Sequence, residues 1–267
     1  MSRISTTFQQ LRAANEKAFV AFITAGDPEV DASVPAMHSL AAHGADIIEL
    51  GVPFTDPEAD GPSIQRSSER AIANGVTLRK TCEIVTEFRA SNTTTPVVLM
   101  GYLNPILAIG VEAFAHLAHA AGIDGLIIVN LPPEEADSLA AALAKFEIDL
   151  IFLVAPTTPA ARMANLANKS TGFIYYVSFK GITGADHLDV EDVQHHVLEL
   201  KTTSNTPVAV GFGIKTAEHA KAVAKIADAV VVGSALVDIL GNGESRFDQL
   251  KAIQAFTQSI KQAITSH

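Results

Sequence analysis

Short apolar runs alternate with amphipathic helical patterns along the whole chain. Eight runs are rich in aliphatic and aromatic residues, and none of them contains a lysine or an arginine. Runs of this kind, bounded by turn residues, predict parallel strands that are buried on both faces. The predicted strands are residues 19–25, 46–50, 96–101, 125–129, 149–154, 173–177, 207–212 and 228–232.

Helical patterns occupy the intervals between these strands. The apolar-periodic segment 31–43 is followed by Gly44, the residue type that commonly ends a helix. A short helix is predicted to begin near Ser234, directly after the last strand. The other predicted helices are residues 3–14, 64–73, 78–90, 111–121, 133–145, 159–169, 189–202, 216–225 and 244–263.

This order of elements favours a closed (β/α)8 barrel, or TIM barrel, with extra N-terminal and loop helices. We expect the amphipathic segment 3–14 to close the bottom of that barrel. An open doubly wound sheet is the alternative, because the number of strands does not prove closure. Against it, no Gly-x-Gly-x-x-Gly motif follows the first strand. No linker or clear repeat divides the chain, so we expect residues 1–267 to form a single TIM-barrel domain.

Charge and cysteine content narrow the classes of partner and compartment. The 267 residues carry a formal net charge of −10, which argues against nucleic acid or an anionic membrane as a partner. No apolar run reaches the roughly 18 residues of a membrane span, and the N-terminus lacks the apolar core of a signal peptide. The single cysteine, Cys82, rules out an internal disulfide. We therefore expect a cytoplasmic protein.

Two acids around the second predicted strand are the strongest candidates for catalysis. Glu49 lies near the carboxyl end of that strand, where barrels place their active sites, and its sequence neighbours are apolar. Such surroundings raise the pKa of a carboxyl group and suit it to exchange protons near neutral pH. Asp60 follows in a loop rich in proline and glycine, which must fold back to bring the acids together. The alternatives are a structural Glu49 paired with a cation from a loop and a merely solvated Asp60.

Three glycine-containing loops are predicted to follow the last three strands. They contain residues 181–184, 211–214 and 233–235, and the last begins with Gly233-Ser234. In barrels, loops at this position commonly bind phosphate through backbone N–H groups. Each loop taken alone is explained by a tight turn, but three on one rim favour phosphate binding. Backbone donors should dominate, because residues 210–214 and 231–236 contain no lysine or arginine.

Four aromatic residues lie within or just after predicted strands: Phe22, Tyr102, Tyr175 and Phe212. Such residues are commonly part of the core, but together they could form the wall of an aromatic substrate pocket. None of the nine histidines lies within a predicted strand, so we expect no metal site at the barrel mouth.

These features restrict the chemistry. A barrel aldolase usually uses a strand lysine or a metal, and the sequence predicts neither. Carboxylates alone suffice where the substrate provides its own electron sink, as an indole ring protonated at carbon 3 does. Two alternatives remain at this point: another phosphosugar-binding barrel such as an isomerase, and a catalytically silent barrel that activates a partner chain.

The motifs of the chain resemble those of the tryptophan synthase alpha chain family over essentially the whole length. The most specific stretch is Glu-Leu-Gly-Val-Pro-Phe at 49–54, followed by Asp-Pro-x-Ala-Asp-Gly-Pro at 56–62. The remaining motifs are Gly-Asp-Pro at 26–28, Asn-Pro at 104–105, Leu-Pro-Pro-Glu-Glu at 131–135, Gly-Ile-Thr-Gly at 181–184, Gly-Phe-Gly-Ile at 211–214 and Gly-Ser-Ala at 233–235.

This resemblance implies a lyase of tryptophan biosynthesis that cleaves indole-3-glycerol phosphate to indole and glyceraldehyde 3-phosphate. It implies that Glu49 is the acid–base residue and that Asp60 holds the indole N–H. Tyr175 and Thr183 would help to position these acids. The implied phosphate site is Gly184, Gly213, Gly233 and Ser234, and the implied indole contacts are Phe22, Tyr102 and Phe212.

The resemblance also implies a partner, the tryptophan synthase beta chain, in an alpha2beta2 heterotetramer. The beta chain uses pyridoxal phosphate, and no cofactor or metal is expected on the present chain. Three positions depart from common family forms. Glu58 replaces a frequent apolar residue, Asn130 a frequent aspartate, and Phe179 an arginine of some members. Glu58 and Phe179 bear on loop closure and docking.

Overall fold

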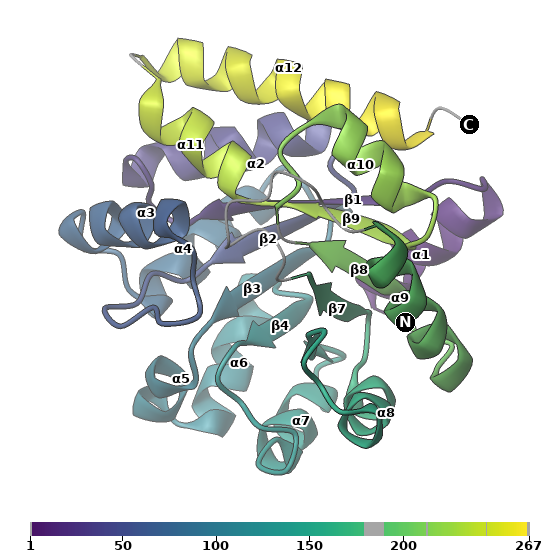
Figure 1. The fold of residues 1–267 in the computed structure, drawn as a ribbon. Helices are drawn as coiled ribbons and strands as arrows, with labels where there is room; N and C mark the ends of the chain where they lie inside the picture. The colour runs from purple at the N-terminus through teal and green to yellow at the C-terminus, as the bar shows by residue number, and fades with distance from the viewer. Residues whose placement is uncertain (1, 179–189, 212, 244, 266–267) are drawn as a thin grey trace.

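A parallel β-sheet forms the centre of the molecule, and helices surround it (Figure 1). The structure is a computed structural model and describes residues 2–178, 190–211, 213–243 and 245–265. The strands are β1 (Ala18–Thr24), β2 (Ile47–Gly51), β3 (Val97–Gly101), β4 (Gly125–Ile128), β5 (Asp149–Ile151), β6 (Leu153–Val154), β7 (Ile174–Val177), β8 (Val208–Gly211) and β9 (Ala229–Val232).

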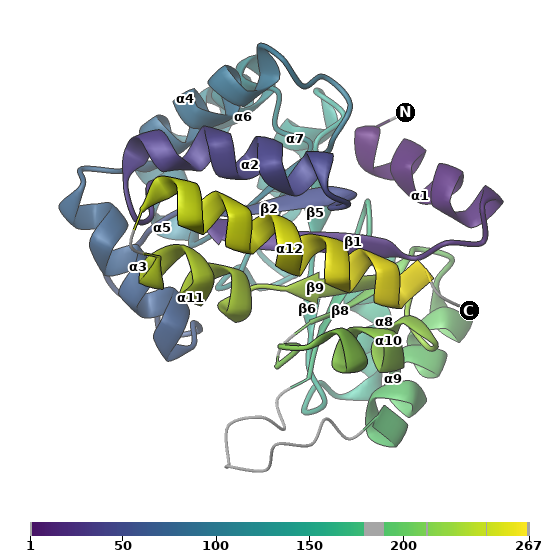
Figure 2. The ribbon, with the colours of Figure 1, turned by 90° about the horizontal axis from the view of Figure 1, so that it is seen from above.

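The helices follow the strands in nearly the predicted order. α12 packs against α2, α10 and α11 on the outside of the sheet (Figures 1 and 2). The helices are α1 (Arg3–Ala13), η1 (Val30–Ala32), α2 (Ser33–Ala42), α3 (Pro62–Ala73), α4 (Leu78–Arg89), α5 (Leu103–Ile109), α6 (Val111–Ala121), α7 (Asp137–Ala144), α8 (Ala160–Lys169), α9 (Val190–Thr203), α10 (Ala217–Ala224), α11 (Ser234–Asn242) and α12 (Arg246–Thr265).

The sheet closes on itself through the segment from β5 to β6. The strand order is β5-β4-β3-β2-β1-β9-β8-β7-β6, and every pair is parallel. The two ends of this order are separated in the chain by Phe152 alone. The Phe152 N–H donates to Ser170 Oγ at 3.1 Å, outside the sheet, so the predicted fifth strand is divided in two. The expected eight-stranded barrel is confirmed, and the open doubly wound sheet is wrong.

The inside of the barrel is filled by apolar side chains that alternate along the strands. α1 lies at the end of the barrel where β1 begins, and its Ile4 and Phe8 join this inner core (Figure 2). The ring centroids of Phe8 and Phe173 lie 6.0 Å apart. The expected closure of the bottom by the N-terminal helix is therefore confirmed. The inner core includes Val20, Ile47, Val98, Ile127, Ile151, Phe173, Ala209 and Val231.

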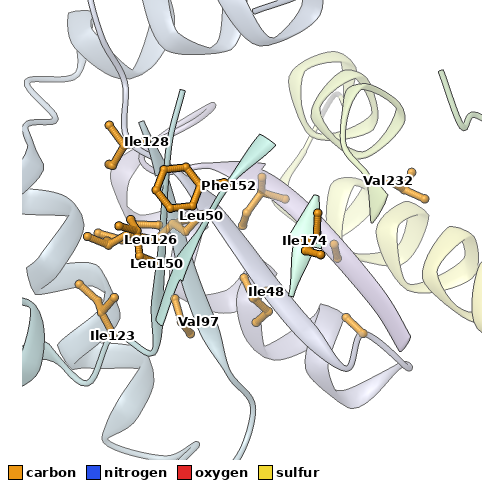
Figure 3. Packing of buried hydrophobic residues seen from close by; sticks show 14 of the residues in the cluster. Ile48, Leu50, Val97, Ile123, Leu126, Ile128, Leu150, Phe152, Ile174 and Val232 are labelled. Carbon is orange, nitrogen blue, oxygen red and sulfur yellow. The ribbon is translucent and has the colours of Figure 1, made fainter. Parts of the chain in front are cut away.

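A second and larger core lies between the strands and the surrounding helices. Its members include Ile48, Leu126 and Leu150, whose side chains pack on the side of the strands that faces the helices (Figure 3). Successive strand residues therefore enter different cores, as for Ile47 and Ile48. Both faces of each strand are buried, which explains why the strands read as continuous apolar runs in the sequence.

Aspartates directly before β2, β4 and β9 hold the amino ends of the strands together. Each accepts a backbone N–H from the start of the preceding barrel strand and pairs with a helix cation. The N–H donors are Phe19 to Asp46 at 2.7 Å, Val97 to Asp124 at 2.8 Å, and Val208 to Asp228 at 3.0 Å. The cation partners are Lys261 to Asp46 at 2.8 Å, Arg89 to Asp124 at 2.6 Å, and Lys201 to Asp228 at 3.0 Å.

One helix, α5, is absent from the residue ranges predicted above. It is short and follows β3 directly, so its sequence gives little helical period. Its first N–H group, on Leu103, donates to Asn130 Oδ1 at 2.8 Å, and Asn130 Nδ2 also donates to Asn104 Oδ1 at 3.3 Å. Asn130 therefore caps α5 from a neighbouring loop, a role for which an asparagine is suited.

Candidate active site

A cavity of about 290 Å³ lies at the carboxyl ends of the barrel strands. Seven of the eleven site residues proposed from the sequence line it. They are Phe22, Glu49, Asp60, Tyr175, Gly213, Gly233 and Ser234. Tyr102 lies beside it, in a smaller cavity that Phe22 and Asp60 also line. Thr183, Gly184 and Phe212 lie outside the described residues, so their predicted roles stay predictions.

Glu49 is a buried carboxyl group with unsatisfied hydrogen-bonding capacity. The residue is 1% exposed, and its Oε2 atom has no hydrogen-bond partner among the described residues. Burial, and after it the nearby charge of Asp60, raises the pKa of Glu49 to about 8. At neutral pH the carboxyl group therefore holds its proton in most molecules, and it faces a cavity in which a substrate can take that proton.

Asp60 is held at the cavity by the loop that follows β2. The Tyr102 hydroxyl accepts the Ala59 N–H at 3.0 Å and donates to Asp60 Oδ2 at 3.4 Å. Gln65 Nε2 donates to the Asp60 carbonyl at 2.8 Å. Burial raises the pKa of Asp60 to about 6, and the hydrogen bond from Tyr102 opposes that rise. The loop thus folds back and brings both acids to one cavity.

Tyr175 packs at the mouth of the barrel against β8. Burial, and after it the charge of Glu49, raises the pKa of the Tyr175 hydroxyl well above its ordinary value. The Tyr175 ring and hydroxyl occupy the space where a Cβ atom on Gly211 would lie. Gly211 is therefore required for this close approach, a packing role that differs from both the tight turn and the phosphate contact considered from the sequence.

Gly213 leaves the backbone open, whereas a Cβ atom on Gly233 would meet the side chain of Phe22 at 3.3 Å. Gly213 has a φ of +76° and no atom within 4 Å of the place of a Cβ. Gly233 precedes the first residue of α11, Ser234, and no side chain caps that helix. The first N–H groups of a helix lack partners within the helix and favour an anion. Gly213, Gly233 and Ser234 line the same cavity as the two acids.

Lys215 also lines this cavity, and the sequence argument missed it. The prediction of backbone donors was based on residues 210–214, and Lys215 is the next residue of the chain. The signal available in the sequence was the lysine directly after Gly-Phe-Gly-Ile. Of the three departures from family forms, Glu58 is exposed beside Asp60 and Phe179 lies outside the described residues.

The model of the tryptophan synthase alpha chain family matches residues 8–265 of the chain. The chain belongs to the tryptophan synthase alpha chain family. This is a family of lyases in tryptophan biosynthesis that cleave indole-3-glycerol phosphate. Membership overturns the alternative of a phosphosugar isomerase.

Curated relatives and solved structures agree with this assignment. The chain is 53% identical to the tryptophan synthase alpha chain of Laribacter hongkongensis, over 99% of both chains. It is 56% identical to that of Chromobacterium violaceum, over 89% of this chain and 90% of the relative. A crystal structure of the alpha subunit from Legionella pneumophila matches with a TM-score of 0.93 and 43% identity, covering both chains completely.

A chain of the tryptophan synthase from M. tuberculosis, in its aminoacrylate-bound form, matches with a TM-score of 0.88 and 38% identity. The match covers 99% of this chain and 100% of that one.

Within the described part of the chain, no helix combines the length and the apolar character needed to cross a membrane. The same residues contain no group of three or more histidine, cysteine or acidic side chains placed to hold a metal ion.

Proposed function

We propose that this chain cleaves indole-3-glycerol phosphate to indole and glyceraldehyde 3-phosphate by carboxylate acid–base catalysis at Glu49. The observation that carries the proposal is the buried Glu49 carboxyl, whose Oε2 has no described partner, in one cavity with Asp60. A raised pKa lets Glu49 donate and recover a proton near neutral pH.

The proposed reaction begins when the protonated Glu49 carboxyl gives its proton to carbon 3 of the indole ring. The ring then carries a positive charge, which the ionised Asp60 stabilises through a hydrogen bond from the indole N–H. The Glu49 carboxylate removes the proton of the neighbouring glycerol hydroxyl. The carbon–carbon bond breaks, its electron pair returns to the ring, and an aldehyde forms. Glu49 is protonated again at the end, so no cofactor is consumed.

The other predicted residues complete this site in the proposal. Tyr175, with Thr183, positions the acids. Phe22, Tyr102 and Phe212 flank the indole ring, whereas Gly184, Gly213, Gly233 and Ser234 bind the phosphate. The chain acts as a single domain in the cytoplasm, with the tryptophan synthase beta chain as its partner in an alpha2beta2 complex.

The test measures indole released from indole-3-glycerol phosphate by the wild-type chain and by the Glu49→Gln variant. Glutamine retains the shape of the side chain but carries no exchangeable acid proton, so kcat should fall about 10²–10⁴-fold. Binding of the non-cleavable analogue indole propanol phosphate should persist. The matched control is Glu87→Gln, which alters an exposed glutamate of α4.

A fall in kcat of less than tenfold would assign the proton transfer to another group. A wild-type chain that binds the analogue but releases no indole, with or without a beta chain, would favour the remaining alternative, a silent barrel that activates its partner.

A further inference from the structure

Lys215 is the cationic side chain nearest in sequence to the glycine loop after β8. It lines the same cavity as Gly213, Gly233 and Ser234. Among the described residues that line this cavity, it is the one lysine or arginine. Lys215 itself is exposed, so its ammonium group can reach a ligand without first losing its water to a buried site.

The charge of Lys215 is not used elsewhere in the described structure. Lys201 and Lys261 form ion pairs with Asp228 and Asp46 at the opposite end of the barrel. Lys215 forms no ion pair with any residue that the structure describes. A lysine that lines a ligand cavity and carries a charge without an ion-pair partner among the described residues is available for an anion.

The electrostatics of the cavity create a need for such a cation. Asp60, which is largely ionised at neutral pH, lines the cavity beside the protonated Glu49, and the chain as a whole carries a net charge of −10. A phosphate monoester adds about −1.5 to −2 charges at neutral pH. The backbone donors at Gly213 and Gly233 are dipoles without net charge, so they orient the phosphate but leave its charge uncompensated.

The geometry points to Lys215 as a specificity-determining residue that binds the phosphoryl group of the substrate and selects phosphorylated over unphosphorylated ligands. This inference rests on the proposed function for the identity of the substrate. A lysine suits the task because its ammonium is a compact charge that needs no fixed bidentate geometry. The contrasting interpretation is a solvated surface lysine without a role.

The experiment compares wild type with Lys215→Met and Lys215→Arg, with Lys221→Met as the control. Lys221 is an exposed lysine of α10 that does not line the cavity, so its loss changes the net charge equally. Affinity for indole propanol phosphate and for indole propanol is measured by calorimetry at low and high salt. Lys215→Met should weaken binding of the phosphorylated ligand about tenfold at low salt, or about 1.4 kcal/mol.

Four further results are expected. Screening should reduce the difference at high salt, indole propanol should bind wild type and Lys215→Met equally, and Lys215→Arg should regain most of the lost affinity. In turnover, Lys215→Met should raise KM more than it lowers kcat.

Equal affinity of wild type and Lys215→Met for indole propanol phosphate would overturn the inference. An equal loss in Lys221→Met would also overturn it, because the effect would then come from net charge alone. Binding is measured without turnover, so a wild-type chain that releases no indole would contradict the proposed function while leaving this comparison decisive.

Discussion

At the scale of single residues, the burial of Glu49 makes its carboxyl group costly to ionise, yet proton exchange requires that group to ionise. A carboxyl group buried without a cation is costly to ionise, and the side chain is 1% exposed. The fold meets this cost by keeping the group protonated, since its pKa lies at about 8. The same condition provides an acid at neutral pH. At Asp60, burial raises the pKa, but the hydrogen bond from Tyr102 lowers it because that bond favours the ionised carboxylate.

The first prediction follows from the proton held by Glu49. Its pKa is about 8 in the folded chain and near 4.5 in the unfolded chain. Between these values the folded state binds more protons than the unfolded state, so the free energy of unfolding falls as pH rises. The Glu49→Gln variant has no carboxyl group to titrate at this position, so it does not show this fall in the free energy of unfolding. The stability of the variant relative to wild type should therefore increase from about pH 5 to about pH 8, by roughly 2–4 kcal/mol.

Urea unfolding followed by circular dichroism at several pH values measures this difference. The Glu87→Gln variant serves as the reference, because that side chain is exposed. A stability difference between Glu49→Gln and wild type that stays constant with pH would show that Glu49 ionises normally in the folded chain. This measurement does not depend on activity.

At the scale of elements, the two ends of the strands serve different purposes. The carboxyl ends expose Glu49, Tyr175 and open backbone at Gly213 to a cavity. The amino ends instead satisfy their polar groups internally, as at Asp124, which accepts from Val97 and pairs with two arginines. The stabilising interactions are thereby kept apart from the rim at which ligands bind.

The Asp124→Asn variant tests whether the interactions at the amino ends of the strands stabilise the fold. The Asp124 side chain is 4% exposed and lies 2.6 Å from Arg89 and 2.7 Å from Arg3. Asparagine can still accept the Val97 N–H, but it leaves the 10%-exposed Arg89 guanidinium without its counter-charge. We expect a loss of about 3 kcal/mol in the free energy of unfolding.

The control for this variant is Glu112→Gln, which breaks the exposed pair between Glu112 and Lys145. That pair should contribute no more than about 1 kcal/mol. Equal losses in the two variants would refute the view that the buried aspartates hold the strand ends together.

The sequence alone predicts those elements whose hydrophobic pattern is set by burial. All eight barrel strands are buried on both faces, and this leaves a visible apolar run for each. α5 was missed because a seven-residue helix capped from another loop leaves almost no local signal. The function of Gly211 was also hidden, because it depends on the position of the Tyr175 ring from a different strand. Lys215 directly follows residues 210–214, the segment whose lack of cations predicts phosphate binding by backbone donors.

At the scale of the whole molecule, the cavity rim is also the surface from which a partner can reach Asp60. The loop before α3 contains Phe54, whose ring stacks on Tyr102 with centroids 4.8 Å apart. Tyr102 in turn bonds to Asp60 and directly precedes α5. On α5, Leu107 is 58% exposed, an unusual position for a large apolar side chain.

We propose that this series of contacts lets a docked beta chain influence Asp60. We expect a partner that presses on residues 53–56 to change the position of Phe54, and we expect Tyr102 to transmit that change to Asp60. In this proposal, docking shifts the population of the loop toward the conformation that places Asp60 for catalysis. Direct transfer to a docked partner would also prevent the loss of indole, a small apolar molecule, to bulk water.

We therefore expect the isolated chain to be a weakly active monomer whose indole release rises at least tenfold with its cognate beta chain. This factor corresponds to about 1.4 kcal/mol in the activation barrier. Glu58 adds a negative charge to the same loop. Beta chains from other species should therefore stimulate less unless they offer a cation at that contact. Titration of the chain with cognate and foreign beta chains, with indole as the measured product, distinguishes these cases. If indole release does not rise at saturating cognate beta chain, residues 53–62 serve only to hold Asp60 and have no part in communication with the partner.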